Sequence, residues 1–190
     1  MELLAMSVWY QPRNTLFIHV PRTAGTSMER NWFLGKGGHE TIREYPEAKA
    51  NGAFSFSFVR NPWDRFVSAY FIQNHFVPDF ANFNDYIDKN CREDYPYANV
   101  YNIHFLPMTY FLLDEDGKIG VDFVGRYENL RADWEYVTNK MEVENDLQHL
   151  RKSEHAPYKE CYTRESWDII GNLYAYDIEL FGYSGDTFDG

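Results

Sequence analysis

The sequence has few cysteines, little positive charge and no long hydrophobic run, and each shortage excludes a class of protein. Cys91 and Cys161 are far apart, with no second thiol or histidine at ligand spacing, so we expect two reduced thiols. The six histidines form neither an HxH nor an HExxH pattern. We therefore expect no metal site.

Basic residues are outnumbered, with 18 Lys and Arg against 29 Asp and Glu and a net charge of −11. A protein this acidic is a poor general partner for nucleic acid or for an anionic membrane. Any anion that it binds must therefore be held by a local group of arginines and backbone N–H groups.

No stretch approaches the roughly 20 apolar residues of a membrane span. Residues 1–10 contain Glu2, no basic residue and an apolar run too short for a signal peptide, so we expect a soluble, cytoplasmic protein. With 190 residues, of which 44% are hydrophobic, the chain suits one domain with a single core, residues 1–190. We expect residues 184–190 to be a frayed tail.

Apolar runs alternate with turns and helical patterns. The expected strands are 15–20, 54–59 and 121–125, the expected helices are 27–34, 62–73, 128–141 and 165–180, and 114–117 is an expected turn. Residues 77–108 should mix short helices with loops. Strand, turn and helix in repetition predict an α/β fold, a single-domain parallel β-sheet flanked by helices, in which ligands bind at the carboxyl ends of the strands.

The turn after the first expected strand, residues 21–27, reads Pro-Arg-Thr-Ala-Gly-Thr-Ser. Gly25 would let the backbone approach an oxyanion, and the helix that follows would point its N–H groups at it. A Walker A loop needs Lys before its Ser or Thr, whereas this turn has Thr26 there and its cation earlier, at Arg22. The turn thus indicates an anion site unlike that of a P-loop kinase, unless its hydroxyls merely cap the helix.

The second expected strand runs into a second motif, FVRNPWDRFVSAY, at residues 58–70. Arg60 leaves the strand, and Ser68 lies two turns into the following helix, so that both could reach one anion. The alternative is that Arg60 pairs with an acid and Ser68 faces solvent.

These two motifs resemble those of the 3′-phosphoadenosine 5′-phosphosulfate (PAPS)-dependent sulfotransferases, most closely the carbohydrate-type, sulfotransferase 2-like branch. The matching stretches are 18–27 and 60–70, and the resemblance continues in GRYENL at 125–130, in Ser153, His155 and Tyr158, and in DIELFGY at 177–183. It covers most of the chain in the right order and implies a P-loop-like sulfotransferase fold.

The resemblance implies roles for particular residues. The 5′-phosphosulfate would be held by the first motif and the 3′-phosphate by the second, while Tyr127 would lie against adenine and a basic pair would precede a loop over the 3′-phosphate. The residues of the first motif are Arg22, Thr23, Ala24, Gly25, Thr26 and Ser27, and those of the second motif are Arg60 and Ser68. The basic pair is Arg151 and Lys152. For Tyr127 a core position is the alternative, and for the basic pair a solvated surface.

One position departs from the family. Arg22 stands where the family usually has Lys, and an arginine, with a pKa above about 12, stabilises the leaving oxygen by hydrogen bonds without protonating it. The chemistry survives this change on paper, because charge stabilisation usually outweighs proton donation.

The acceptor hydroxyl must lose a proton as it attacks, and histidine is the usual base at neutral pH. His39, in the GGHET stretch, lies where relatives carry their base, and His104, in NIHFLP, is the second candidate. His19, on the first expected strand, is expected to be a core residue.

The sequence therefore predicts an enzyme that moves a sulfuryl group from PAPS to an acceptor hydroxyl and releases PAP. The acidic composition favours a neutral saccharide or small molecule as the acceptor. A non-catalytic PAPS- or PAP-binding module and a P-loop-like kinase remain as alternatives.

Overall fold

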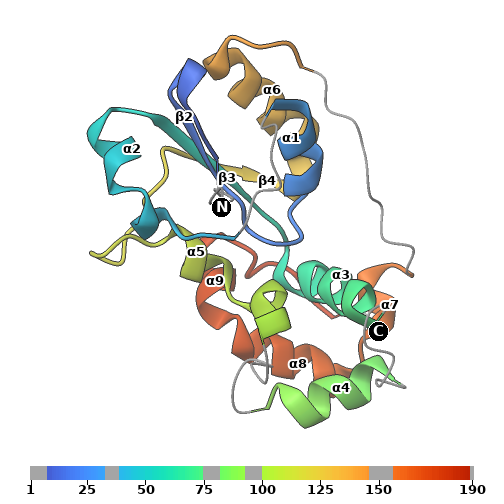
Figure 1. Cartoon of the computed structure of the whole chain (residues 1–190). Coiled ribbons are helices and arrows are strands. Elements are labelled where there is room, and N and C mark those ends of the chain that lie inside the picture. Colours follow the sequence, from blue (N-terminus) through green and yellow to red (C-terminus); the bar gives the residue numbers. More distant parts are fainter. Residues whose placement is uncertain (1–7, 33–38, 75–81, 93–99, 146–155, 189–190) are drawn as a thin grey trace. The chain divides into compact units, whose positions relative to one another are not determined.

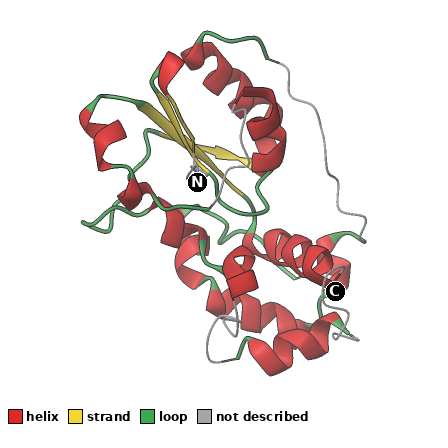
Figure 2. Cartoon of the chain, in the orientation of Figure 1, coloured by secondary structure: helices red, strands yellow, loops and turns green. Residues whose placement is uncertain are grey.

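The structure is a computed structural model that describes residues 8–32, 39–74, 82–92, 100–145 and 156–188. The chain divides into two compact units, each continuous in space but not in sequence. The first unit comprises residues 1–59 and 108–151, and the second comprises residues 60–107 and 152–190. Figure 2 shows that the described strands all lie in the first unit, whereas the second is helical.

The first unit is built on a four-stranded sheet in the order β1-β2-β3-β4. β2 pairs with β3 and β3 pairs with β4 in parallel, while β1 runs antiparallel to β2 at one edge. The strands are β1 (Val8–Tyr10), β2 (Thr15–Ile18), β3 (Phe54–Val59) and β4 (Phe123–Arg126). The helices of this unit are α1 (Gly25–Trp32), α2 (Pro46–Ala50), α5 (Met108–Leu112) and α6 (Leu130–Met141), with 3₁₀ helices at Gln11–Arg13, Ile42–Glu44 and Tyr127–Asn129. The prediction of an α/β fold with a parallel sheet flanked by helices is confirmed, with one antiparallel edge strand added.

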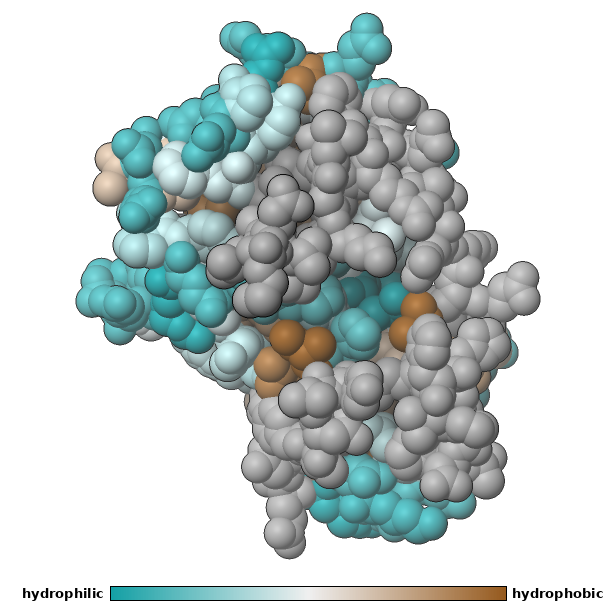
Figure 3. Space-filling view, viewed as in Figure 1, coloured by the Kyte–Doolittle hydropathy of each residue, from teal (hydrophilic) through white to brown (hydrophobic). Residues whose placement is uncertain are grey.

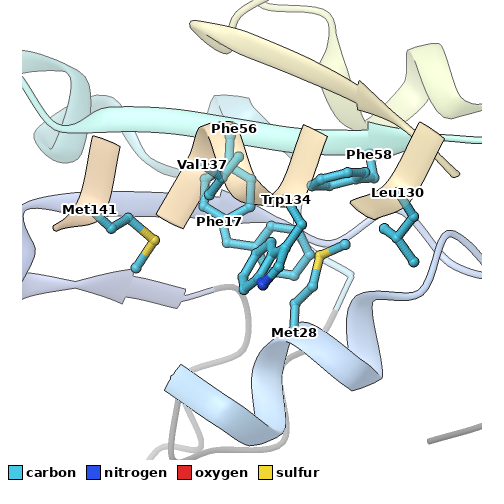
Figure 4. Close-up of a cluster of buried hydrophobic side chains, with 8 residues drawn as sticks. All are labelled: Phe17, Met28, Phe56, Phe58, Leu130, Trp134, Val137 and Met141. Atoms are coloured by element: carbon cyan, nitrogen blue, oxygen red, sulfur yellow. The ribbon is translucent and has the colours of Figure 1, made fainter. Parts of the chain in front are cut away.

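The central strand β3 alternates phenylalanine with serine and is buried along most of its length. Its phenylalanines face α1 and α6, where Phe56 and Phe58 contact the fully buried Trp134 (Figure 4). Its serines are also buried, and Ser57 Oγ donates a hydrogen bond of 2.7 Å to the Ile18 carbonyl. Burial on both faces is typical of a strand inside a parallel sheet. A hydroxyl is tolerated there because its hydrogen bond is satisfied.

α1 and α6 lie on the same side of the sheet, with α2 on the other side (Figure 1). The core between α1, α6 and the sheet consists of Phe17, Met28, Phe56, Phe58, Leu130, Trp134, Val137 and Met141. This packing fixes where β2 ends and α1 begins, and hence the turn of residues 21–27 that joins them.

The second unit packs α3 (Pro62–Asn74) against helices from distant parts of the chain. Its other helices are α4 (Phe83–Asn90), α7 (Tyr158–Cys161), α8 (Arg164–Leu173) and α9 (Ala175–Leu180), with a 3₁₀ helix at Val100–Phe105. Asn61 is the N-cap of α3, since its Oδ1 accepts from the N–H groups of Trp63 and Asp64 at 3.0 and 3.2 Å. The indole of Trp63 stacks on that of Trp167, with ring centroids 4.4 Å apart.

Several predicted elements need correction. The helix expected at 165–180 is two helices, because the chain turns at Tyr174, whose ring is buried and whose hydroxyl bonds the Phe105 carbonyl. The third strand covers 123–126 instead of 121–125, and β1, α2, α5 and α7 were not predicted. Residues 33–38, which include the end of the helix expected at 27–34, lie outside the described residues.

The C-terminal segment makes specific contacts in the second unit up to residue 188. The Asp186 carboxylate accepts hydrogen bonds from Asn61 Nδ2 at 2.6 Å and from the Tyr158 hydroxyl at 2.7 Å, and it pairs with Lys159. Phe188 lies against Trp167. This segment therefore reaches the residue that caps α3.

On the face in view, the described residues are mostly hydrophilic, and hydrophobic ones appear in small groups (Figure 3). Within the described ranges, no helix combines the length and the apolar character needed to cross a membrane.

Candidate functional site

The turn between β2 and α1 has an unusual backbone. Arg22 and Ala24 both adopt the left-handed region, with φ of 69° and 73°, although neither is glycine. Such conformations cost of order 1–3 kcal/mol each and concentrate at ligand-binding turns. A backbone that alternates between left- and right-handed residues directs successive N–H groups into one concavity, which is a common way to bind an anion.

Side chains inside the turn hold this shape. Thr23 is fully buried, and its hydroxyl donates a 2.8 Å hydrogen bond to the Val20 carbonyl. The Ser27 N–H donates to the Ala24 carbonyl at 2.9 Å, which begins α1. Thr23 thus serves the turn itself, whereas Arg22 and Thr26 are half-buried and reach its surface.

Gly25 is required by a close approach and not by its φ angle. A Cβ atom at this position would lie 2.2 Å from Cδ2 and from Nε2 of His19, far inside van der Waals contact. The His19 side chain is 6% exposed and stacks on Phe17, with ring centroids 5.6 Å apart. The turn therefore packs directly on the imidazole of His19.

His39 also contacts His19. Its ring meets that of His19 edge-on, with centroids 4.5 Å apart, and its Nδ1 lies 3.0 Å from the His19 carbonyl oxygen. A carbonyl oxygen only accepts, so Nδ1 of His39 must carry a proton, which in the neutral imidazole leaves the lone pair on Nε2. The structure thus brings one of the two predicted bases next to the turn of residues 21–27, which we call the anion turn because it is predicted to bind an anion.

In the second unit, Arg60 and Ser68 are both buried, at 6% and 0% exposure. Arg60 Nε donates to Asp64 Oδ2 at 2.8 Å across one helical turn. The alternative for this motif is correct for Arg60, which pairs with an acid. It is wrong for Ser68, which does not face solvent. The Arg60–Asp64 pair occupies one edge of the guanidinium and fixes its orientation.

The second candidate base, His104, is half-buried in the second unit, on the 3₁₀ helix Val100–Phe105. Tyr127 is half-buried in the first unit, directly after β4. Arg151 and Lys152 lie outside the described residues, as do Ser153 and His155.

Sequence reasoning missed Arg65, the second arginine of the RNPWDR motif. Its side chain is 1% exposed, and its two Nη atoms donate to the carbonyls of His104 and Leu106, at 3.1 and 2.5 Å. The guanidinium also lies 5.5 Å from the ring centroid of Tyr174. A charged residue between apolar helix positions was the available signal, but its partners are 39 and 41 residues away.

Both cysteine thiols have a raised pKa. Burial raises the pKa of the Cys91 thiol to about 12. For Cys161, burial and the nearby Glu160 and Asp64 carboxylates also raise the thiol pKa. Both are free thiols, as expected. No group of three or more His, Cys, Asp or Glu side chains suited to a metal ion occurs in the part of the chain that the structure describes.

Comparisons with known proteins show which family the chain belongs to. The chain is 31% identical over 98 residues to an uncharacterized protein of Archaeoglobus fulgidus, an alignment that covers 51% of this chain and 74% of the relative. No solved structure gives a significant match. A model of the Sulfotransferase family matches residues 8–184, which include the anion turn, the RNPWDR motif and all four strands. The α/β architecture is consistent with the P-loop-like fold of that family, and the chain belongs to the sulfotransferase family.

Proposed function

We propose that this sulfotransferase takes the sulfuryl group from PAPS and places it on the hydroxyl of an acceptor, releasing PAP. The observation that carries the proposal is the strained turn of residues 21–27, packed on His19 through Gly25. Family membership supports sulfotransferase activity in general. The turn supports a donor with a strongly anionic group.

The fit of this turn to a phosphosulfate rests on its backbone. In the proposal, N–H groups of Thr23 to Thr26 and the hydroxyls of Thr26 and Ser27 bind the oxygens, and the N-terminus of α1 adds a favourable dipole. The two left-handed residues keep the cradle open before a ligand arrives, so little reorganisation is needed on binding. Thr23 contributes through its backbone, because its hydroxyl already bonds Val20.

PAPS would supply the sulfuryl group, whose bond to the 5′-phosphate oxygen breaks as the acceptor oxygen bonds to sulfur. In the proposal, the Arg22 guanidinium donates hydrogen bonds to that phosphate oxygen as it takes up the electron pair. It remains protonated throughout, so its contribution is charge stabilisation alone.

We assign the base to His39, which needs an unprotonated ring nitrogen. The carbonyl of His19 holds the proton of His39 on Nδ1, so the lone pair of the neutral ring is on Nε2, and we propose that Nε2 accepts the proton of the acceptor hydroxyl. The edge-on contact with His19 fixes the ring beside the anion turn. His104 is assigned to the acceptor and not to proton transfer.

For the 3′-phosphate we propose Arg60 and Ser68. Asp64 orients the guanidinium of Arg60 by accepting a hydrogen bond from Nε, and we propose that the Nη atoms donate to the phosphate. Burial strengthens such charge-assisted hydrogen bonds because the local dielectric constant is low. Tyr127 is proposed to lie against adenine, and Arg151 and Lys152 to precede a loop over the 3′-phosphate.

The proposed acceptor is a neutral saccharide or another small hydroxyl compound of the cytoplasm. The net charge of −11 would repel the polyanionic glycans that other carbohydrate-type enzymes use. We propose that the chain works as one functional domain, without a metal.

The test is turnover by the purified protein with PAPS and a panel of neutral and anionic hydroxyl compounds, measured as PAP release and as sulfate ester formed. We expect neutral acceptors to be used and adenosine 5′-phosphosulfate, which lacks the 3′-phosphate, to be a poor donor. PAP release that equals ester formation would support transfer over hydrolysis. An acceptor used equally well with both donors would argue against the roles given to Arg60 and Ser68.

A second candidate function is a PAPS- or PAP-binding protein without turnover, which Arg22 favours because it stands where the family usually has lysine. The same measurements separate the two functions. Tight binding of PAP with no ester from any acceptor, and no gain in activity from Arg22→Lys, would support the binding protein.

A further inference from the structure

An exposed arginine of the first unit ties the segment that carries His39 to a neighbouring helix. Arg43 lies on the 3₁₀ helix Ile42–Glu44, four residues after His39. Its Nη1 donates to the Leu113 carbonyl at 3.2 Å, and its Nη2 donates to the Tyr110 carbonyl at 3.1 Å. The guanidinium also lies 5.6 Å from the ring centroid of Tyr110. Arg43 therefore binds the C-terminal end of α5, where basic side chains commonly satisfy backbone carbonyls.

The helix that Arg43 holds carries a ring that contacts His39. Phe111 of α5 is fully buried, and its ring meets that of His39 edge-on, with centroids 6.4 Å apart. The two carbonyls that Arg43 binds belong to residues on either side of Phe111 in the sequence. The imidazole of His39 thus has ring contacts with His19 and with Phe111, and Arg43 joins the backbone segment of His39 to the helix of Phe111.

The segment 39–45 is also braced within itself. The Thr41 N–H donates to the Glu44 carboxylate at 2.6 Å, as part of a capping box on the 3₁₀ helix. The Tyr45 hydroxyl donates to the Glu40 carboxylate. Because these hydrogen bonds connect both ends of the segment, a restraint on residue 43 also restrains the backbone next to His39.

Buried packing holds the same segment independently of Arg43. The Ile42 side chain is 2% exposed, and a Cβ atom on Gly120 would lie 2.9 Å from its Cγ1. Arg43 itself is exposed, and hydrogen bonds and ion pairs of exposed side chains contribute little to the free energy of unfolding. The fold should therefore survive the loss of Arg43, so that an effect on turnover can be separated from an effect on stability.

We propose that Arg43 is a positioning residue for His39. By tying the segment 39–45 to the end of α5, it holds the imidazole where Nδ1 meets the His19 carbonyl. The inference rests on the proposed function, in which Nε2 of His39 accepts the proton. A misplacement of about 1 Å can cost on the order of 100-fold in rate, so hydrogen bonds that add little stability can still matter for turnover. All of these residues belong to the first unit.

The variant for a test is Arg43→Met, which keeps an unbranched side chain and removes the guanidinium. The matched control is Lys49→Met. Lys49 is also an exposed cation of the first unit, and its Nζ lies 3.5 Å from a carboxylate oxygen of Asp114, just beyond α5. Arg43→Lys is the conservative variant, because an ammonium keeps the charge but lacks the planar fork that donates to two carbonyls at once.

Four quantities are measured for each variant: kcat with the acceptor found for the wild type, the Kd for PAP, the melting temperature, and the ¹⁵N NMR signals of the His39 ring. We expect Arg43→Met to lower kcat about tenfold or more, with the PAP Kd within about twofold of wild type. Its melting temperature should stay within about 3 °C of wild type. The ring nitrogen signals should move away from those of the Nδ1–H tautomer. Lys49→Met should match wild type, and Arg43→Lys should be intermediate.

A His39→Ala background tests whether Arg43 acts through His39. There Arg43→Met should lower kcat no further, because the group that it positions is gone. An equal fall of kcat in both backgrounds would overturn the inference. Unchanged kcat or unchanged His39 signals in Arg43→Met, or equal effects of Arg43→Met and Lys49→Met, would overturn it as well. If the wild type transfers no sulfuryl group to any acceptor, the proposed function fails, whereas the ring nitrogen signals still decide whether Arg43 positions His39.

Discussion

At the scale of single residues, the candidate site depends on one imidazole that the sequence presents as an ordinary core histidine. His19 supports Gly25 through its ring and His39 through both its ring and its carbonyl. The anion turn and the proposed base are thus set by the same residue. This geometry makes two side-chain changes informative.

Gly25→Ala should destabilise the protein by about 1–3 kcal/mol, the usual cost of forcing extra atoms into a packed core. The new Cβ would lie 2.2 Å from the His19 ring, so that ring or the turn must move. In a His19→Ala background the space is open, and the same substitution should cost less. Urea denaturation of the four proteins measures this coupling. Gly185→Ala is the control, because a Cβ there has no neighbour within 4 Å. An equal loss of unfolding free energy from Gly25→Ala in both backgrounds would contradict the packing of the turn on His19.

His39→Ala should lower kcat by about 10²- to 10⁴-fold while the PAP Kd stays near wild type, as expected for loss of a positioned general base. The acid limb of the pH profile of kcat/KM should vanish, since no imidazole remains to be protonated. His104→Ala should instead raise the acceptor KM. Full turnover in His39→Ala together with its loss in His104→Ala would exchange the two assignments, and loss of PAP binding in His39→Ala would leave the base unassigned.

The limits of sequence reasoning are clearest at this scale. Motif spacing predicted that the turn of residues 21–27 lies between a strand and a helix, and the structure has it there. It did not reveal that Arg22 and Ala24 are left-handed, since backbone strain is held by surrounding packing and leaves no pattern of residue types. The contacts of His19 and Arg65 were equally hidden, because their partners are distant in sequence.

At the scale of elements, α3 links the second motif to the rest of its unit. The side chain of Asn61 makes two kinds of contact. Its Oδ1 caps α3, and its Nδ2 donates to Asp186 near the C-terminus. The cap was predictable from Asn-Pro before a helical pattern. The link to Asp186 was not, because 125 residues separate the two side chains.

Asn61→Ala should therefore cost more stability than removal of an ordinary cap. A lost cap costs about 1 kcal/mol, and the buried hydrogen bond to the Asp186 carboxylate adds about another 1 kcal/mol or more. Asn82→Ala is the matched comparison in the same unit, because Asn82 Oδ1 caps α4 by accepting from the Asn84 N–H at 2.9 Å. Denaturation midpoints for both variants test this. A cost for Asn61→Ala no greater than that for Asn82→Ala would mean that the Asp186 contact contributes nothing to stability.

The other elements show which patterns carry enough information. β2 and β3 were predicted because buried parallel strands are apolar or contain satisfied serines throughout, and α3 and α6 because their apolar spacing is regular. β1 was missed because its three residues, VWY, are too short to show alternation. The predicted helix 165–180 was continuous because α8 and α9 both bury apolar residues at helical spacing, and that spacing does not register the turn at Tyr174.

At the scale of the whole molecule, an acidic protein is proposed to bind a ligand with two anionic ends. The overall field, with a net charge of −11, opposes that binding, so affinity must come from groups that the fold places locally. The turn of residues 21–27 and Arg60 are proposed to be such groups. In the proposal they differ in the ligand that they require, because the turn would accept any terminal oxyanion whereas Arg60 would require a 3′-phosphate.

This difference predicts that PAP raises the melting temperature much more than ATP does, because a ligand stabilises only in proportion to its binding to the native state. ATP offers phosphates to the turn but has no 3′-phosphate, and the turn lacks the Gly-Lys-Ser that would hold its triphosphate. Arg60→Ala should weaken PAP binding by about 1.5–3 kcal/mol, the worth of a charge-assisted hydrogen bond, and should leave adenosine 5′-phosphosulfate almost unaffected. Thermal denaturation at matched ligand concentrations, with wild type and Arg60→Ala, measures both effects. Equal shifts with PAP and ATP would remove the 3′-phosphate site from the proposal. A loss of melting temperature in Arg60→Ala without ligand, with PAP and adenosine 5′-phosphosulfate affinities lowered alike, would instead make the Arg60–Asp64 pair a support of the fold.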